Sequence, residues 1–251
     1  MAAGKGTRMK SQLPKVLHAI AGRPLLQHVT DTAAAMQARR VVVITGHGAP
    51  QVEDACTQFV ASADQSAEQS ANAPVVHFVR QEPQLGTGHA VQQAVPALPD
   101  DGVVLVLSGD VPLTQVATLQ SLVALCAGQH LALLTLELAN PSGYGRIVRE
   151  GDAVKAIVEQ KDASDTQRQI REIYSGIMAV PAVLLKKWLA RLDNKNAQGE
   201  YYLTDVVKFA VADGVAVLAH KIDDEVQVAG VNSPVQLAAL ERAFQHRLAL
   251  A

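Results

Sequence analysis

The chain has 251 residues, of which 49% are hydrophobic and 18% charged, and its 22 basic side chains against 24 acidic ones give a net charge of −2. This composition is typical of a globular protein and excludes a disordered or fibrous chain. The near-neutral balance also argues against a dedicated nucleic-acid-binding protein.

No apolar run approaches the roughly 20 residues that span a bilayer, and the first residues lack the apolar core of a signal peptide. Cys56 and Cys126 lie far apart and form no CxxC motif, which argues against a zinc site or a disulfide framework. We therefore expect a cytoplasmic protein with no membrane or nucleic-acid partner.

The first half of the chain alternates between strand and helix patterns. Apolar runs bounded by turn residues predict strands over residues 41–45, 75–79, 103–107 and 131–136. These runs are apolar at nearly every position, as in strands that are covered on both faces. Between them, apolar side chains recur at helical spacing, as at Leu25, Leu26, Val29 and Ala33. The alternation predicts an α/β protein with a parallel sheet of βαβ units.

The second half has shorter, partly alternating strand patterns over residues 146–148, 154–159 and 173–180, which predict an antiparallel insert or edge. Helices are expected over residues 182–192 and 203–212, and a strand near 215–219. The polar segment 61–74 is aperiodic and predicts a surface loop. Ser233, Pro234 and Gln236 match a capping box that begins a last helix.

Three loops carry residues that suit phosphate or nucleotide chemistry. The segment AAGKGTRM is a Gly-rich turn near two cations, Arg8 and Lys15, but it has the spacing of neither a P-loop nor a dinucleotide fingerprint. A surface hairpin with scattered basic residues is the alternative, and the LPK that follows makes it less favoured.

The second loop, SGDVPL, places Asp110 after an apolar strand, where open α/β sheets bind ligands and where a hard oxygen donor suits Mg²⁺. A helix cap is an equally good interpretation of Asp110 alone. The third loop, QEPQLGTGHA, offers side-chain amides and a Gly-Thr-Gly turn that can read a nucleobase edge, although any βα loop can be rich in glycine.

Together these segments resemble the N-terminal uridyltransferase domain of the bacterial bifunctional N-acetylglucosamine-1-phosphate uridyltransferase/glucosamine-1-phosphate acetyltransferases. The resemblance extends over essentially all 251 residues and is carried, in order, by AAGKGTRM, LPKVLH, AGRPLLQHV, QLGTGHAV, GDVPL, GYGRI, VEQKDA, NAQGEYYLTDVV and GVN. GKGTR with LPK is typical of nucleotide-sugar pyrophosphorylases in general. GTGHA, NAQGEYYLTD and GVN narrow the resemblance to the enzymes that act on N-acetylglucosamine 1-phosphate.

The resemblance implies a Rossmann-like nucleotidyltransferase fold with a mixed, mostly parallel sheet flanked by helices. It implies Mg²⁺-assisted uridylyl transfer from UTP to N-acetylglucosamine 1-phosphate, giving UDP-N-acetylglucosamine and pyrophosphate for peptidoglycan and lipopolysaccharide synthesis. Two alternatives stay open: a nucleotidyltransferase with another base or acceptor, and a truncated or non-catalytic nucleotide-binding module.

The same resemblance assigns roles to individual residues. Backbone contacts to the nucleotide are expected from Ala2, Ala3 and Gly4, and contacts to uracil from Gln81, Gly86 and Thr87. Arg8, Lys15 and Asp110 are the expected catalytic residues, and Asp110 and Asn232 the expected Mg²⁺ ligands. Further substrate contacts are expected from Lys15, Ser108, Gly109, Asp110, Gly145, Glu159, Tyr174 and Asn232.

Two positions depart from the family pattern. The family usually has Asn, a contact of the nucleotide sugar, where this chain has Tyr174, and some members have Tyr where it has Ser108.

The resemblance also predicts the domain organisation. We expect a nucleotidyltransferase domain over residues 1–232 and a linker helix over residues 233–251, without the hexapeptide repeats of the acetyltransferase domain. In this fold an apolar strand of about five residues precedes the AAGKG loop. We therefore expect the natural chain to continue upstream, or the chain as written to be unstable or inactive. The oligomeric state stays open.

Overall fold

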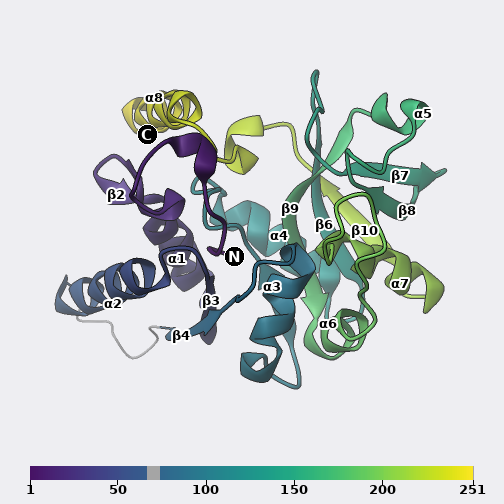
Figure 1. Cartoon of the computed structure of the whole chain (residues 1–251), viewed down its shortest axis with the longest axis horizontal. Coiled ribbons are helices and arrows are strands. Elements are labelled where there is room, and N and C mark those ends of the chain that lie inside the picture. The colour runs from purple at the N-terminus through teal and green to yellow at the C-terminus, as the bar shows by residue number, and fades with distance from the viewer. Residues whose placement is uncertain (67–73, 251) are drawn as a thin grey trace. The chain divides into compact units, whose positions relative to one another are not determined.

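A computed structural model describes residues 1–66 and 74–250 of the chain (Figure 1). The residues form two compact units. The first comprises Met1–Glu82, Ser108–Val116 and Val226–Ala251, and the second comprises Pro83–Leu107 and Ala117–Glu225. No helix in the described part is long and apolar enough to cross a membrane.

The first unit is built around a parallel pair of strands, β3 (Arg40–Thr45) and β4 (Val75–Arg80). Its helices are α1 (Leu25–Ala35), α2 (Ala49–Ser66) and α8 (Pro234–Leu250), with short 3-10 turns η1 (Thr7–Met9) and η2 (Lys15–Leu17). Strands β1 (Ala19–Ile20) and β2 (Arg23–Pro24) form a small hairpin between η2 and α1.

Two apolar clusters hold the first unit together. One joins the chain start and η2 to α1, β3 and α2 through Ala2, Val16, Leu26, Val43, Val52 and Cys56. The other joins η1, the hairpin and α1 to α8 through Met9, Ile20, Leu25, Leu113, Val231 and Leu240. The helical spacing seen in the sequence is therefore the buried face of α1, where Leu25, Leu26, Val29 and Ala33 are all buried.

The second unit contains a six-stranded mixed sheet in the order β10-β6-β9-β7-β8, with β5 paired to β9. The strands are β5 (Val103–Val106), β6 (Leu131–Glu137), β7 (Arg146–Glu150), β8 (Ala153–Val158), β9 (Glu172–Pro181) and β10 (Val217–Lys221). β10 runs parallel to β6, whereas β9 runs antiparallel to β5, β6 and β7. The mixed sheet and the antiparallel pairing of its later strands agree with the sequence prediction.

The helices of the second unit are α3 (Thr87–Ala94), α4 (Val116–Cys126, which starts at the unit boundary), α5 (Asp165–Arg168), α6 (Ala182–Leu189) and α7 (Val206–Ala212). The second unit also contains the 3-10 turns η4 (Val95–Ala97) and η5 (Leu203–Asp205). The 3-10 turn η6 (Glu225–Val228) lies where the chain passes from the second unit to the first. In β6, every residue from Leu131 to Leu136 is buried, as expected for a strand covered on both faces.

Three predicted elements differ from the structure. Residues 61–66 were expected in a loop, but they continue α2, which is anchored upstream by the buried Val52 and Cys56. The remainder of that predicted loop, residues 67–73, lies outside the described residues. The helix expected over 182–192 ends at Leu189, and the one expected over 203–212 begins with the η5 turn.

Candidate functional site

The Gly-rich loop at the chain start lies against the end of β3. The Ala2 backbone N–H donates to the Ile44 carbonyl oxygen at 2.8 Å, and the His47 N–H donates to the Ala3 carbonyl oxygen at 3.2 Å. Gly4 is exposed, and a side chain added there would meet nothing within 4 Å. The loop is thus fixed at Ala2 and Ala3 and open at Gly4.

Gly6 allows this loop to approach Lys15. Its φ is +59°, and a Cβ atom there would come within 2.7 Å of the Lys15 Cβ atom. A residue with a side chain would meet both the strain of the left-handed backbone region and this overlap. Gly6 is therefore the residue that sets the Lys15 side chain against the loop.

The cation Arg8, on η1, is exposed. Within the described part of the chain its guanidinium has no hydrogen-bond or ion-pair partner, so it is accessible to bind a negatively charged ligand.

Lys15 is the centre of a polar cluster in the first unit. Its Nζ atom donates to Asp110 Oδ2 at 2.5 Å and to Asn232 Oδ1 at 3.1 Å. Only 14% of the Lys15 side chain and 19% of the Asp110 side chain are exposed, so solvent screens this ion pair less than a surface pair. The structure therefore brings together three of the predicted site residues.

Backbone contacts hold the two partners of Lys15 in place. The Val231 N–H donates to the Asp110 carbonyl oxygen at 2.9 Å, which joins the GDVPL and GVN segments. Gln236 Oε1, in the first turn of α8, accepts from the Asn232 N–H at 2.8 Å, and Ser233 Oγ accepts from the Gln236 N–H at 3.3 Å. The predicted Ser233 cap is present, and the glutamine of the capping pattern also fixes Asn232.

Gly109 is tightly enclosed beside this cluster. Its N–H donates to the Met1 carbonyl oxygen at 2.8 Å, and a Cβ atom there would lie 3.1 Å from that oxygen and 3.2 Å from Leu26 Cδ1.

Ser108 is partly buried, and its carbonyl oxygen accepts from the Val111 N–H at 3.1 Å. Gln81, also in this unit, is buried, and its N–H donates to the Thr45 carbonyl oxygen at 2.8 Å.

In the second unit, Glu159 lies at the end of β8 beside the Gly145 backbone. A Cβ atom at Gly145 would stand 3.7 Å from each Glu159 carboxylate oxygen and 2.7 Å from Ile157 Cγ2, so only glycine leaves this space open. The Tyr174 N–H donates to the Gly145 carbonyl oxygen at 2.9 Å. Gly145, Glu159 and Tyr174 therefore form the second group of predicted residues that the structure brings together.

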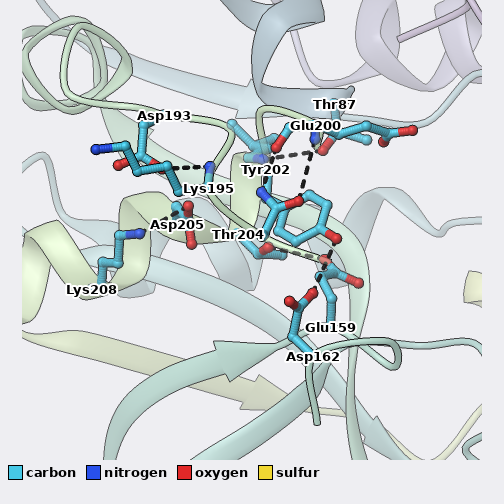
Figure 2. A network of polar contacts seen from close by, with 12 residues as sticks. Thr87, Glu159, Asp162, Asp193, Lys195, Glu200, Tyr202, Thr204, Asp205 and Lys208 are labelled. Atoms are coloured by element: carbon cyan, nitrogen blue, oxygen red, sulfur yellow. Dashed lines mark hydrogen bonds and ion pairs between the residues drawn. The ribbon is translucent and has the colours of Figure 1, made fainter. Parts of the chain in front are cut away.

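Figure 2 shows the polar network that surrounds Glu159. Thr204 Oγ1 donates to Glu159 Oε1 at 2.9 Å, and the Tyr202 hydroxyl donates to Asp162 Oδ2 at 3.0 Å. Asp162 Oδ1 also accepts from the Ala197 N–H at 2.9 Å. The NAQGEYYLTD segment is in this way tied to the VEQKDA segment.

The electrostatic setting of Glu159 is unusual for a carboxylate. Burial raises the pKa of Glu159 above its ordinary value, and the nearby acidic groups of Asp162, Asp205 and Glu200 raise it further, against the opposing effect of the Thr204 hydrogen bond. Such a carboxyl group suits a ligand that supplies hydroxyl or amide donors.

Tyr174 is 7% exposed, and its hydroxyl has no hydrogen-bond partner within the described part of the chain. Burial and the nearby Glu159 charge both raise the pKa of this hydroxyl. At this position, where the family usually has Asn, the buried aromatic ring of Tyr174 therefore lies beside Glu159.

The GTG loop packs against the same NAQGEYYLTD segment. The Gly88 N–H donates to the Tyr201 carbonyl oxygen at 2.7 Å, the Tyr201 N–H donates to the Leu85 carbonyl oxygen at 2.8 Å, and Thr87 Oγ1 accepts from the Leu203 N–H at 3.0 Å. A Cβ atom at Gly86, whose φ is +110°, would lie 2.6 Å from the Tyr201 carbonyl oxygen. The glycine at this position is therefore needed for the two loops to meet.

Several residues of these groups carried no assigned role in the sequence analysis. They are Arg146, Gln160, Asp162, Tyr202 and Thr204. Arg146 is 1% exposed, and its guanidinium donates to the Tyr144 carbonyl oxygen and, at 2.6 Å, to Gln160 Oε1. Because Gln160 follows Glu159, this contact fixes the turn that carries Gly145 beside the Glu159 carboxylate. The signal for these residues was their place inside the GYGRI, VEQKDA and NAQGEYYLTDVV strings.

The donor set also bears on metal binding. No group of three or more His, Cys, Asp or Glu side chains in the described part could hold a metal ion. Asp110 Oδ2 and Asn232 Oδ1 nevertheless converge on one positive charge, the Lys15 ammonium. One carboxylate and one amide oxygen fit Mg²⁺, which usually takes one or two protein oxygens together with substrate phosphates and water.

Comparison with known proteins identifies what the chain is similar to. Residues 1–209 match the family described as the MobA-like NTP transferase domain. The chain is 70% identical over 251 residues to the bifunctional protein GlmU of Albidiferax ferrireducens and 69% identical over 254 residues to that of Polaromonas naphthalenivorans. These alignments cover 100% and 99% of the chain but 52% of each relative, so the chain spans about half the length of the curated relatives it matches.

Two solved structures share the fold. A UDP-glucose pyrophosphorylase complexed with UDP-glucose has a TM-score of 0.75 at 20% identity and covers 98% of this chain and 97% of its own. An apo UDP-glucose pyrophosphorylase has a TM-score of 0.71 at 18% identity, covering 98% and 96%. The predicted nucleotidyltransferase fold is confirmed.

The contact between Gly6 and Lys15 gives a first prediction. Gly6→Ala should lower the free energy of unfolding by about 1–2 kcal/mol through backbone strain and by about 1–3 kcal/mol more through overlap with Lys15. Gly22→Ala is the matched control, because Gly22 also has a positive φ, of +74°, but a Cβ atom there would meet nothing within 4 Å. Urea unfolding of both variants measures the difference, and equal losses would contradict the role of Gly6.

The raised pKa of Glu159 gives a second prediction. An acid whose pKa is higher in the folded state than in the unfolded state binds its proton more tightly in the folded state. The free energy of unfolding therefore falls as pH rises from the unfolded-state pKa through the folded-state pKa. Glu159→Gln removes that cost while keeping an oxygen for Thr204. We expect it to raise the free energy of unfolding at pH 8 by about 0.5–2 kcal/mol, the range of common stabilising substitutions.

The gain from Glu159→Gln should shrink as pH falls toward 4, where Glu159 is itself protonated. Urea unfolding at pH 8, 6 and 4 measures this trend, and a gain that does not depend on pH would argue against an ionised, destabilising Glu159.

Proposed function

Because the chain belongs to the MobA-like NTP transferase family, we propose that it transfers the uridylyl group of UTP to N-acetylglucosamine 1-phosphate, giving UDP-N-acetylglucosamine and pyrophosphate. The observation that carries the proposal is the convergence of Lys15, Asp110 and Asn232 beside a Gly-rich loop with an exposed Arg8. The 70% and 69% identities to two GlmU proteins favour this reaction over transfer of another nucleotide. The solved UDP-glucose pyrophosphorylases support a uridine nucleotide as the class of ligand.

The attacking group in this reaction needs little activation. A phosphate monoester has a second pKa of about 6, so at pH 7 the sugar phosphate is already mostly dianionic and no general base is required. The obstacle is the approach of one anion to another and the charge that develops on the transferred group and on pyrophosphate. Arg8 and Lys15, together with the backbone amides of the Gly-rich loop, are the groups of this chain that offset that charge.

Arg8 and Lys15 have different roles in this proposal. Arg8 is exposed and without a partner in the described residues, so it is the group to bind the triphosphate as it enters. Lys15 is partly buried against Gly6 and is the group to neutralise charge close to the reacting phosphate. The backbones of Ala2, Ala3 and Gly4 would border the nucleotide, as would those of Ser108 and Gly109.

We propose Mg²⁺ as the metal, held by Asp110 and Asn232, whose oxygens both contact Lys15. When bound, Mg²⁺ neutralises phosphate charge and polarises the phosphoryl group. The Gln236 contact to the Asn232 N–H, and the Val231 contact to the Asp110 carbonyl oxygen, keep the two ligand segments aligned.

The second group of residues suits the neutral parts of the substrates. We propose that Glu159 accepts hydrogen bonds from the sugar, with Gly145 and Tyr174 beside it. Gln81, Gly86 and Thr87 would contact uracil, and the contacts from Thr87 and Gly88 to the 201–203 backbone would join that loop to the sugar side.

For the chain as a whole we propose a nucleotidyltransferase domain over residues 1–232 and a linker helix over residues 233–251. We also propose a cytoplasmic location, because both substrates are phosphorylated metabolites of the cell interior.

The decisive experiment is a pyrophosphate-release assay with UTP, CTP, GTP and ATP against N-acetylglucosamine 1-phosphate, glucosamine 1-phosphate and glucose 1-phosphate, with and without Mg²⁺. We expect turnover with UTP and N-acetylglucosamine 1-phosphate that stops when EDTA removes the metal. A preference for another nucleotide or acceptor would support a different nucleotidyltransferase, and a protein that binds UTP without turnover would support a binding module.

Arg8 gives a prediction within the same assay. Arg8→Ala should lower kcat by about 10²- to 10³-fold, the usual effect of removing one group that stabilises developing charge. The free energy of unfolding should change by less than about 0.5 kcal/mol, because the side chain is exposed. Arg242→Ala, at an exposed arginine of α8, is the control for loss of one surface charge and should keep full activity. Near-normal turnover of Arg8→Ala would remove Arg8 from the mechanism.

A further inference from the structure

The Lys15 ammonium already occupies the position on which the two proposed metal ligands converge. Lys15 Nζ lies 2.5 Å from Asp110 Oδ2 and 3.1 Å from Asn232 Oδ1. The ammonium group of Lys15 donates to both oxygens, so the negative charge of Asp110 is neutralised from within the protein. A divalent cation that binds the same two oxygens would have to share them with a positive charge.

Sharing is unfavourable for two reasons. Mg²⁺ binds its oxygen ligands at 2.0–2.1 Å, which leaves little room for an ammonium hydrogen-bonded to the same oxygens. The two cations would also repel each other where little solvent screens them, because only 14% and 19% of the Lys15 and Asp110 side chains are exposed. One of the two positive groups must therefore withdraw.

The lysine is able to withdraw by a short distance only. A Cβ atom at Gly6 would lie 2.7, 3.4 and 3.5 Å from the Lys15 Cβ, Cγ and Cδ atoms, so the stem of the side chain packs against the Gly6 backbone. Rotation about the last bonds moves Nζ away from Asp110 but keeps it beside the Gly-rich loop. The released ammonium then faces the place where the proposed function puts the nucleotide phosphates.

We propose that Lys15 is an internal cation that competes with the divalent metal for Asp110 and Asn232, and that metal binding releases Lys15 to contact the substrate phosphates. The proposal rests on the proposed function in taking Asp110 and Asn232 as metal ligands. Metal affinity is then low without nucleotide, because the ion must displace Lys15. It rises with nucleotide, because the phosphates supply both further ligands and a new partner for the lysine.

The test measures Mn²⁺ binding to the nucleotide-free protein by the loss of the free Mn²⁺ EPR signal. Lys15→Met keeps the length of the side chain and removes its charge, and we expect it to bind Mn²⁺ at least tenfold more tightly than the unmodified protein. At the same time its turnover of UTP and N-acetylglucosamine 1-phosphate should fall by about 10²-fold or more. A residue with a merely structural role would not raise metal affinity while lowering activity.

Loss of a proposed ligand makes the readout specific. Asp110→Asn, alone and with Lys15→Met, should abolish the binding if the ion occupies this site. Equal or weaker Mn²⁺ affinity in Lys15→Met, or no binding at all, would overturn the proposal.

A measurement on the unmodified protein covers the case in which Lys15→Met does not fold. Acetic anhydride modifies accessible amines, and mass spectrometry quantifies the modification of Lys15. We expect saturating Mn²⁺ to increase it severalfold, and Asp110→Asn to reach that level without metal. Modification unchanged by Mn²⁺ would overturn the proposal, whereas failure of metal-dependent turnover in the unmodified protein would instead count against the proposed function.

Discussion

Asp110 accepts contacts through both its backbone and its side chain, and the site of the first unit depends on the two together. Its carbonyl oxygen binds the Val231 N–H, and its carboxylate binds Lys15, which also reaches Asn232. Lys15 lies 95 positions from Asp110 and 217 from Asn232 in the sequence. One buried charge thus holds three distant segments in register, and the apolar clusters behind them make that register stable.

The two units present opposite chemistry. The first gathers a cationic lysine, an exposed arginine and a glycine-rich backbone, which suits phosphates. The second gathers Glu159 among other acidic groups, with the Thr204 hydroxyl donating to it, which suits a neutral ligand rich in hydroxyl donors. Both environments occur in a chain whose 22 basic and 24 acidic side chains nearly balance.

Local patterns predicted most of the fold, because a strand such as β6 is buried on both faces and is therefore apolar throughout. The end of α2 was not predictable in this way, since polar residues such as those of 61–66 favour helix or loop according to what precedes them. The motifs located Lys15, Asp110 and Asn232, and the family resemblance placed the last two at one metal, but only the folded chain shows that Lys15 contacts both. Arg146 and Asp162 act by holding loops through contacts between distant segments, and spacing along the chain carries no sign of such contacts.

The contacts between the GTG loop and the 201–203 backbone also constrain how this protein can evolve. Gly86 and Gly88 have no room for side chains against that backbone, and Thr87 accepts from the Leu203 N–H. A substitution that reshapes one loop displaces the other, so their sequences should covary among relatives. An attempt to graft a new acceptor specificity onto this scaffold would therefore have to transplant both loops as one unit.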